Sequence, residues 1–366
     1  MIAHPRRVID LAAQVPGAPE AGLTVAPGSI DDLAMVLRHA TDHGLVVQVW
    51  GGGTMSGYGA PPPPDIVVAM SRLGGITVWE PDDLTVVVGG GASVAAVEEE
   101  LNQRGQTMVL TEHPGSSTIG GVLAAGVSSL RRGRLYGTRE RVLETVVVTG
   151  DGRVVRSGGR VVKNVTGYDL SRLHVGAFGS LGVIVSVCLK LWPVPPAAAT
   201  VEVAGLEEAG RVTRPLAVLE ERGRTRVFLS GTGDEVGAMA SRFDGVVSAG
   251  LDWPVDPAGR YRWSLRVPPG RMVEAISEVP SDWDYLAIHG VGEIRAAADG
   301  IDGARELREY AVALGGSLVS VDAPSESLNG LDPWGKPPPG LGLQRDLIAQ
   351  FDPARVINPG RLPGGI

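Results

Sequence analysis

The amino-acid sequence predicts an α+β protein that is rich in strands and turns and is built from two or three domains. Glycine and proline account for 52 and 27 of the 366 residues, and both residues favour turns over long helices. Hydrophobic residues make up 43% of the chain, which supports a large core. Short β-branched runs alternate with short amphipathic segments along most of the chain.

The first half of the chain predicts helices and strands with clear start and stop signals. Residues 27–44 predict a helix, because Ser29 is a good N-cap, apolar residues recur on one face, and Gly44 ends the pattern. Ser93 begins a second predicted helix that ends at Gly105. Strands are predicted at 76–80 and 85–89, at 142–149 and 153–156 around an Asp-Gly turn, and at 183–192.

The stretch from Val46 to Met70 is the centre of the prediction, because it places a glycine turn between two apolar strands. Gly51, Gly52 and Gly53 have no Cβ, so the backbone there tolerates φ > 0 and close approach of a ligand. Consecutive N–H groups in such a turn form an anion-binding nest, and the hydroxyls of Thr54 and Ser56 follow. Taken alone, the stretch fits a glycine-rich hairpin turn equally well.

The glycine turn differs from two familiar nucleotide-binding motifs. The dinucleotide fingerprint needs a third glycine where this chain has Ser56, and it needs a helix where Pro61–Pro64 follow. A phosphate-binding P-loop is absent from the sequence too, since the one Gly-Lys pair is followed by Pro337. A nucleotide would therefore be held by another design.

A second glycine-rich stretch runs from His113 to Ser129 and consists mostly of small residues. It leaves room for a ligand or for another backbone, although a tightly packed helix of small residues fits the stretch by itself. The most basic piece of the chain, Arg131–Arg141, follows directly and contains five arginines. These arginines suit a bound anion, or else they are simply solvated.

Composition excludes several classes of protein. The formal charge of −8 and the lack of a basic run argue against a nucleic-acid partner. The single cysteine, Cys188, cannot form a disulfide within the chain or ligate an iron–sulfur cluster alone, and its apolar run predicts a buried thiol. The six histidines form no H-E-x-x-H pair, so no metal site is expected. The sequence shows no signal-peptide pattern and no membrane span, so we expect a cytoplasmic protein, either free or held at a membrane through partners.

Four linked sequence blocks resemble a known family. In order and spacing, these blocks are similar to the FAD-binding domain of the vanillyl-alcohol oxidase / p-cresol methylhydroxylase type. The blocks are WGGGTMSG, PGSSTIGGVLAAG, YGTRERVLETVVVTGDGRVVRSGG and VKNVTGYDLSRLHVGAFGSLGVIVSVCLKLWP. Within that family the resemblance is strongest to the E subunits of glycolate oxidase, on the run Lys163–Leu173 and the ending Trp334–Arg361. It implies a two-lobed FAD domain (1–196), an antiparallel ferredoxin-like cap (197–330) and a C-terminal segment (331–366) that returns to the FAD domain.

The resemblance implies a role for individual residues. The first loop would hold the FAD diphosphate, a second wall would face it, and two later groups would lie near the flavin and near the adenine and ribose. In that order the residues are Gly51, Gly52, Gly53, Thr54, Ser56 and Gly57; Pro114, Thr118, Ile119, Gly120 and Gly121; Ser128, Tyr136 and Gly137; and Gly179, Gly182, Val183 and Ile184. The first loop has no histidine for covalent attachment, so non-covalent FAD is expected.

The catalytic residues are less well indicated. His289 ends a predicted strand in the cap and is a candidate general base, although a hydrogen-bonded histidine at a strand end explains it as well. Larger catalytic relatives carry G-D-G-N-x-H and E-H-G segments, where this chain has IHGVGEIR and SVDAPSES.

Three hypotheses for function follow. The chain is an FAD subunit of a 2-hydroxy-acid dehydrogenase complex with a larger flavin subunit and an iron–sulfur subunit, a stand-alone FAD oxidase or dehydrogenase, or a flavin-holding scaffold subunit.

Overall fold

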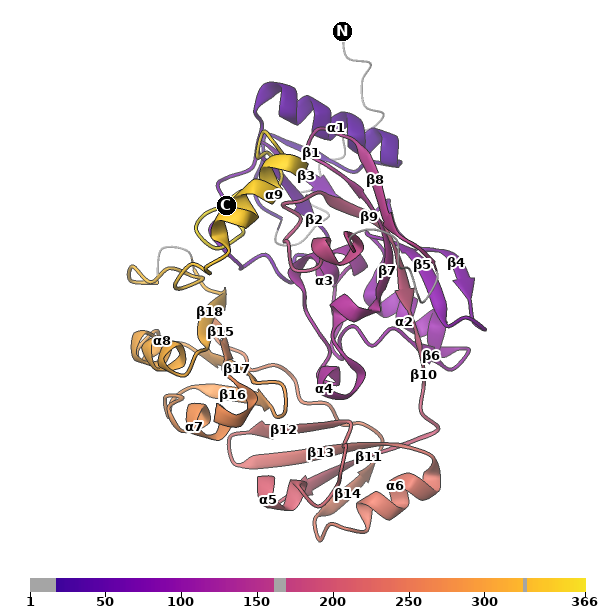
Figure 1. Ribbon diagram of the computed structural model, residues 1–366, viewed down its shortest axis with the longest axis vertical. Helices are drawn as coiled ribbons and strands as arrows, with labels where there is room; N and C mark the ends of the chain where they lie inside the picture. Colours follow the sequence, from indigo (N-terminus) through magenta and orange to yellow (C-terminus); the bar gives the residue numbers. More distant parts are fainter. Residues whose placement is uncertain (1–17, 161–168, 325–327) are drawn as a thin grey trace. The chain divides into compact units, whose positions relative to one another are not determined.

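The computed structural model describes residues 18–160, 169–324 and 328–366, and these residues divide into two compact units (Figure 1). Unit 1 consists of the described parts of Met1–Ser128, Thr138–Pro193 and Pro337–Ile366, and unit 2 consists of Ser129–Gly137 and the described parts of Val194–Lys336. The division expected from the sequence, at residues 196 and 330, lies near these boundaries, but the short segment 129–137 groups with unit 2.

Unit 1 contains a three-stranded parallel sheet in the order β1-β3-β2 and a five-stranded antiparallel sheet in the order β4-β5-β9-β7-β8. A short pair, β6-β10, lies apart from both sheets. The strands are β1 Leu23–Val25, β2 Val47–Trp50, β3 Ile66–Ala69, β4 Ile76–Glu80, β5 Thr85–Gly89, β6 Gln106–Thr107, β7 Val142–Val148, β8 Val154–Gly158, β9 Val183–Lys190 and β10 Trp192–Pro193. The helices are α1 Ile30–His43, α2 Val94–Asn102, α3 Ile119–Ala125, α9 Leu341–Phe351 and the 3₁₀ turns η1 Thr138–Arg141 and η2 Ser171–His174.

The predicted first helix is confirmed together with both of its caps. The Ser29 hydroxyl accepts a hydrogen bond from the Asp32 N–H at 3.1 Å, which satisfies one of the free donors of the first turn. Gly44 ends α1 in the left-handed conformation, with φ of 63°. Leu33 and Leu37 are fully buried, so the apolar face of α1 packs on the core as the sequence spacing predicts.

The two strands around the first glycine turn are parallel, which excludes the hairpin alternative. Val47 pairs with Ile66 and Trp50 with Ala69 in the same direction. A parallel pair requires a crossover rather than a tight turn, and residues 51–65 form that crossover without a helix. The glycine turn is therefore left at the end of β2, where it is open to a ligand.

The long apolar run of β9 is explained by two cores, one on each face of the five-stranded sheet. Val183 and Val185 pack in the same cluster as the apolar residues of α1. Ile184, Val187 and Leu189 pack in the same cluster as the apolar residues of α2 and α3, and the change of face between Val185 and Val187 coincides with a register shift in the pairing of β7 and β9. Because both faces are buried, the strand shows no polar alternation. This arrangement, with one core on each face of the sheet, is the two-lobed organisation expected from the sequence.

Unit 2 contains one eight-stranded antiparallel sheet in the order β14-β11-β13-β12-β16-β17-β15-β18. The strands are β11 Ala197–Val203, β12 Ala217–Glu221, β13 Arg224–Gly231, β14 Val246–Ala249, β15 Tyr261–Arg266, β16 Asp284–Ile288, β17 Glu293–Ala298 and β18 Ser317–Asp322. The helices are α4 Arg132–Leu135, α5 Leu206–Ala209, α6 Gly233–Ala240, α7 Met272–Ser277, α8 Ala304–Ala313 and the 3₁₀ turn η3 Pro269–Arg271.

The eight strands are two ferredoxin-like modules that lie side by side. The first module is β11-α5-β12-β13-α6-β14 and the second is β15-α7-β16-β17-α8-β18, each with the order β-α-β-β-α-β. In each module the fourth strand pairs with the first, the first with the third, and the third with the second. The modules join through β12 and β16, the second strand of each, where Glu220 lies opposite Ala287. The ferredoxin-like module predicted for this part of the chain is therefore present twice in unit 2.

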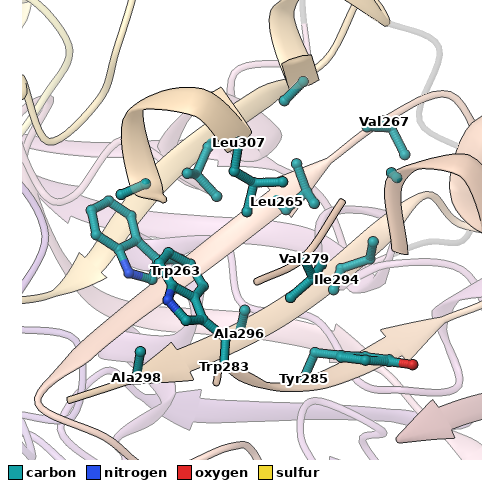
Figure 2. Packing of buried hydrophobic residues seen from close by; sticks show 14 of the residues in the cluster. Trp263, Leu265, Val267, Val279, Trp283, Tyr285, Ile294, Ala296, Ala298 and Leu307 are labelled. Carbon is teal, nitrogen blue, oxygen red and sulfur yellow. The ribbon is translucent and has the colours of Figure 1, made fainter. Parts of the chain in front are cut away.

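The core of the second module is built on two tryptophans (Figure 2). The rings of Trp263 and Trp283 stack with centroids 5.8 Å apart and planes 14° from parallel. Figure 2 shows Tyr285 at the margin of this cluster, where its hydroxyl donates to Glu220 Oε1 at 3.0 Å. Within the three described ranges, no helix combines the length and apolar character that a membrane crossing needs.

We expect the stability of unit 1 to fall on acidification because of His174. This residue of η2 is 2% exposed, and neither ring nitrogen has a hydrogen-bond partner among the described residues. Burial lowers the pKa of His174 from 6.5 to about 4, so between these pH values the unfolded chain binds a proton that the folded chain rejects. Stability that is present above pH 6.5 is then lost as the pH falls towards 4, by about 3 kcal/mol.

Urea unfolding at pH 7 and pH 5 checks this expectation against a His174→Leu variant. The acid-dependent loss should be smaller in the variant than in the natural chain. Equal losses in both proteins would show that other groups are responsible.

Candidate functional site

Two glycine-rich turns of unit 1 meet backbone to backbone. Ser116 Oγ donates to the Gly52 carbonyl at 2.9 Å, and the hydroxyls of Thr54 and Ser117 are 3.1 Å apart. A Cβ on Gly52 would lie 1.7 Å from the Ser116 carbonyl oxygen, and one on Gly51 would lie 2.2 Å from Thr118 Oγ1. Any side chain at either position would force the two turns apart, so these positions require glycine.

The first turn offers donors to an anion. Gly53 has a φ of +72°, which glycine adopts without strain. Among the described residues, no acceptor is found for the N–H groups of Gly51, Gly52 and Gly53. The buried indole N–H of Trp50 also lacks a partner within the described part of the chain. A turn with free N–H groups and no side chains suits a phosphate.

These turns line a hollow in unit 1, which we call the glycine hollow. Twelve of the residues predicted from the sequence line it: Gly51, Gly52, Gly53, Thr54, Ser56, Thr118, Gly120, Gly121, Gly179, Gly182, Val183 and Ile184. The remaining lining residues are Gln48, Val49, Trp50, Met55, Met70, Gly90, Ala124, Ala125, Phe178, Asn358 and Arg361.

Gly90 is one lining residue that sequence reasoning missed. A Cβ on Gly90 would lie 2.0 Å from the Ile184 carbonyl oxygen, and the Gly90 carbonyl accepts from Gly120 N–H at 2.7 Å. The run Gly89–Gly91 was the available signal, but its position before a helix made it look like an ordinary helix start.

The other predicted cofactor residues do not line the glycine hollow. Ile119 is fully buried in the core, and its N–H donates to the Ala92 carbonyl, so it supports the second turn from behind. The Pro114 carbonyl accepts from Ser117 N–H at 2.8 Å and so shapes the same turn. Ser128 accepts from Thr138 N–H at 3.2 Å, while Gly57 lies in the crossover after β2. Tyr136 and Gly137 belong to unit 2.

Unit 2 contains a second hollow of about 570 Å³, which we call the His289 hollow. That volume is typical of sites for small molecules. Arg134, Tyr136, Arg214 and His289 supply its polar side chains, and Tyr136 is 67% exposed. The remaining lining residues are Leu130, Gly133, Leu206, Ala209, Gly210, Val212, Pro215, Leu216, Ala217, Val218, Ile288 and Gly290.

His289 is held by a carboxylate at the junction of the two modules. His289 Nε2 lies 2.8 Å from Glu220 Oε2, and the His289 N–H donates to the Val218 carbonyl at 3.0 Å. The hydrogen bond from His289 is the main cause that holds the pKa of Glu220 below its usual value. Burial and the bond to Glu220 raise the pKa of Tyr285 to about 12, so Tyr285 stays protonated. Because an ionised carboxylate only accepts, His289 Nε2 donates this hydrogen bond, which leaves Nδ1 as the ring nitrogen that is not bound to Glu220.

The arginine-rich stretch is largely used inside the protein. Arg132 Nη2 lies 2.8 Å from Glu293 Oε2, which attaches the segment 129–137 to unit 2. Arg131 lies over the ring of Trp253 and Arg141 over that of Trp192, at 5.6 and 5.5 Å. The alternative of purely solvated arginines is therefore incorrect for these three residues.

Cys188 is a buried core thiol, as the sequence predicts, and burial raises its pKa to about 11. No group of three or more His, Cys, Asp or Glu side chains within the described ranges is arranged to hold a metal ion. The resembling run Lys163–Leu173 and the segment Ser320–Ser327 lie partly outside the described residues.

Comparison with known proteins defines the class of unit 1. Residues 21–158 match the family model described as "FAD binding domain". The chain therefore contains an FAD-binding domain of the p-cresol methylhydroxylase type, and FAD is its cofactor.

Within this class, the sequence is similar to curated FAD-linked proteins. It is 40% identical to glycolate oxidase subunit GlcE from Escherichia coli (strain K12) over 34% of this chain and 36% of the relative. It is 31% identical to a D-lactate dehydrogenase from Archaeoglobus fulgidus, over 49% and 40% of the two chains. It is 31% identical to glycolate oxidase subunit GlcD from Bacillus subtilis (strain 168), over 51% and 40%. The match thus spans about two fifths of the length of these relatives.

The likeness to solved structures concerns the fold. A structure of alkyldihydroxyacetonephosphate synthase superposes with a TM-score of 0.66 at 14% identity, and the match covers 93% of this chain and 76% of that one. The chemistry of the glycine hollow suits the diphosphate of FAD. Hydroxyls, glycine backbone and N–H groups without an acceptor among the described residues lie together there.

We expect Gly52→Ala to remove FAD binding, because its Cβ has no room against the Ser116 carbonyl. The ratio of flavin to protein absorbance in the purified protein should fall at least about tenfold. Gly53→Val should act in the same direction, since its Cβ would lie 2.6 Å from the Trp50 ring.

Gly342→Ala is the matched control, because a Cβ at this helical position of α9 meets nothing within 4 Å. This control should keep its flavin. Circular dichroism of the variants shows whether the fold persists, and stoichiometric flavin in a folded Gly52→Ala protein would exclude the glycine hollow as the FAD site.

Proposed function

We propose that the chain is the FAD-binding E-type subunit of a 2-hydroxy-acid oxidase or dehydrogenase complex of the glycolate oxidase kind. The observation that carries the proposal is the glycine hollow, in which two turns without side chains meet and present free N–H groups. The similarity to proteins named as glycolate oxidase subunits and D-lactate dehydrogenases supports the substrate class. A larger flavin subunit and an iron–sulfur subunit are the proposed partners.

The division of labour between FAD and protein follows from the site. Bound FAD would supply the acceptor for the hydride, and so for the two electrons, that the oxidation of a 2-hydroxy acid releases. The turns at Gly51–Thr54 and Ser116–Thr118 bind and orient the diphosphate part. One cysteine cannot ligate an iron–sulfur cluster by itself, so onward electron transfer is assigned to a partner, a quinone or oxygen.

The His289 hollow is the proposed site of the hydroxy acid. Arg134 and Arg214 line it and suit the substrate carboxylate, because a guanidinium pairs well with a carboxylate. His289 Nδ1 accepts the proton of the substrate hydroxyl, while Glu220 holds the opposite ring nitrogen. Tyr285, protonated against the same carboxylate, keeps Glu220 in place.

A second candidate function is a flavin-holding subunit that supports a catalytic partner without oxidising substrate itself. One feature favours this candidate. Catalytic relatives carry two histidine-containing segments, whereas of the described residues that line the His289 hollow only His289 has an imidazole. A stand-alone oxidase or dehydrogenase is the third candidate, and the lack of the two histidine-containing segments counts against it.

We expect the absorbance band of the bound flavin, at about 450 nm, to bleach when glycolate or D-lactate is added to the purified chain without oxygen. His289→Asn should keep its FAD and slow this bleaching by about a hundredfold, the scale of a lost general base. A flavin band that stays unchanged with both substrates would favour the flavin-holding subunit.

A pull-down of the natural complex tests the proposed partners. Absence of a larger flavin subunit and an iron–sulfur subunit from the captured proteins would contradict them.

We propose that FAD is held without a covalent bond, because the turn Gly51–Tyr58 contains neither histidine nor cysteine. Precipitation with trichloroacetic acid should therefore release the flavin into the supernatant. A yellow pellet that survives washing with organic solvent would contradict the non-covalent attachment.

A further inference from the structure

The segment Val356–Arg361 packs against the three-stranded sheet of unit 1, beside β2. Val47 and Ile357 form a parallel bridge, Val47 N–H donates to the Val356 carbonyl, and Asn358 N–H donates to the Val47 carbonyl, each at 2.8 Å. The Asn358 side chain then joins two walls of the glycine hollow. Its Oδ1 accepts from Val49 N–H at 2.9 Å, and its Nδ2 donates to the Phe178 carbonyl at 2.8 Å.

Three residues further on, the Arg361 side chain is hydrogen-bonded to the backbone that follows the first glycine turn. Its Nη1 donates to the carbonyls of Ser56 and Tyr58, the latter at 2.8 Å. The backbones are in close contact here, because a Cβ on Gly59 would lie 2.6 Å from the Gly360 carbonyl oxygen. The side chain is therefore fixed in one place and is 6% exposed.

The guanidinium of Arg361 has more N–H donors than its two carbonyl partners use. Nη1 carries two N–H groups, which the two carbonyls use, and the Nε and Nη2 groups carry three more. Among the described residues, none of the ion pairs includes Arg361. Burial away from water lowers the pKa of Arg361 to about 10, which is still far above neutral pH, so the side chain stays charged.

Arg361 brings a positive charge to the glycine hollow. Of the described residues that line the hollow, Arg361 is the one with a formal charge at pH 7. A buried cation without a counter-ion is costly, and a ligand that supplies negative charge removes that cost. The diphosphate of FAD has that charge, and the free N–H groups of Gly51–Gly53 line the same hollow.

We propose that Arg361 is the counter-charge of the FAD diphosphate and that it positions this group against the first glycine turn. The proposal rests on the FAD site proposed above and adds a residue from the C-terminal segment to it. Arg361 binds the cofactor and takes no part in hydride transfer.

The test titrates apoprotein with FAD, by flavin fluorescence, over a range of salt concentrations. In the natural chain, Kd should rise with salt. Arg361→Gln should weaken FAD binding at least tenfold at low salt and flatten the plot of log Kd against log salt concentration, because one charge contact is lost. Kd for ADP, measured by calorimetry, should change by a similar factor, since ADP contains the same diphosphate.

The control is Arg345→Gln, which makes the same change in net charge at an exposed position of α9. It should leave Kd within about twofold and the salt dependence unchanged. Arg361→Gln with unchanged affinity would overturn the proposal. A weakened affinity with the salt dependence of the natural chain would do so as well, because it would indicate a role only in holding Ser56 and Tyr58.

Arg361→Lys covers the case in which the glutamine variant does not fold. Lysine keeps the charge but presents a single ammonium, which cannot hold two carbonyls and a diphosphate together. Weaker FAD binding with an unchanged salt dependence supports the proposal, and undiminished affinity overturns it. If the natural apoprotein fails to bind FAD, the proposed function fails, independently of Arg361.

Discussion

The close approach of two backbones at Gly52 and Ser116 is the constraint on which the FAD domain depends. There is no space for even a methyl group between Gly52 and the Ser116 carbonyl, and the hydroxyls of Thr54 and Ser117 join the same turns. Because β2 and β3 are parallel, the chain leaves the first turn through a long crossover rather than a tight hairpin. Binding a diphosphate by N–H groups rather than by lysines is consistent with a chain whose formal charge is −8.

Much of the fold could be predicted because its signals are local. Ser29 and Gly44 mark the ends of α1, and the Asp151–Gly152 turn marks the hairpin of β7 and β8. Twelve lining residues of the glycine hollow lie in runs whose small side chains are visible in the sequence. The direction of pairing between β2 and β3 could not be predicted from those runs, because parallel and antiparallel strands share the same apolar pattern.

What the sequence did not reveal depends on contacts between distant residues. Asn358 bonds to Val49 and Phe178, and Arg361 to Ser56 and Tyr58, across separations of about 180 to 309 positions. No periodicity connects such positions. The doubling of the ferredoxin-like module was also not predicted, because β12 and β14 of the first module have only five and four residues. The Glu220–His289 pair arises only where the two modules join.

The position of Val356–Arg361 beside β2 has a consequence for the order in which unit 1 is completed during synthesis. A ribosome makes β1, β2 and β3 first, then the elements β4 to β10 and β11 to β18, and only afterwards the residues that bond to Val47, Val49 and Phe178. Domains usually fold in the order in which they emerge from the ribosome. The glycine hollow, however, stays incomplete until the segment Val356–Arg361 has been synthesised. Cofactor loading is therefore a late step that follows translation of the second unit.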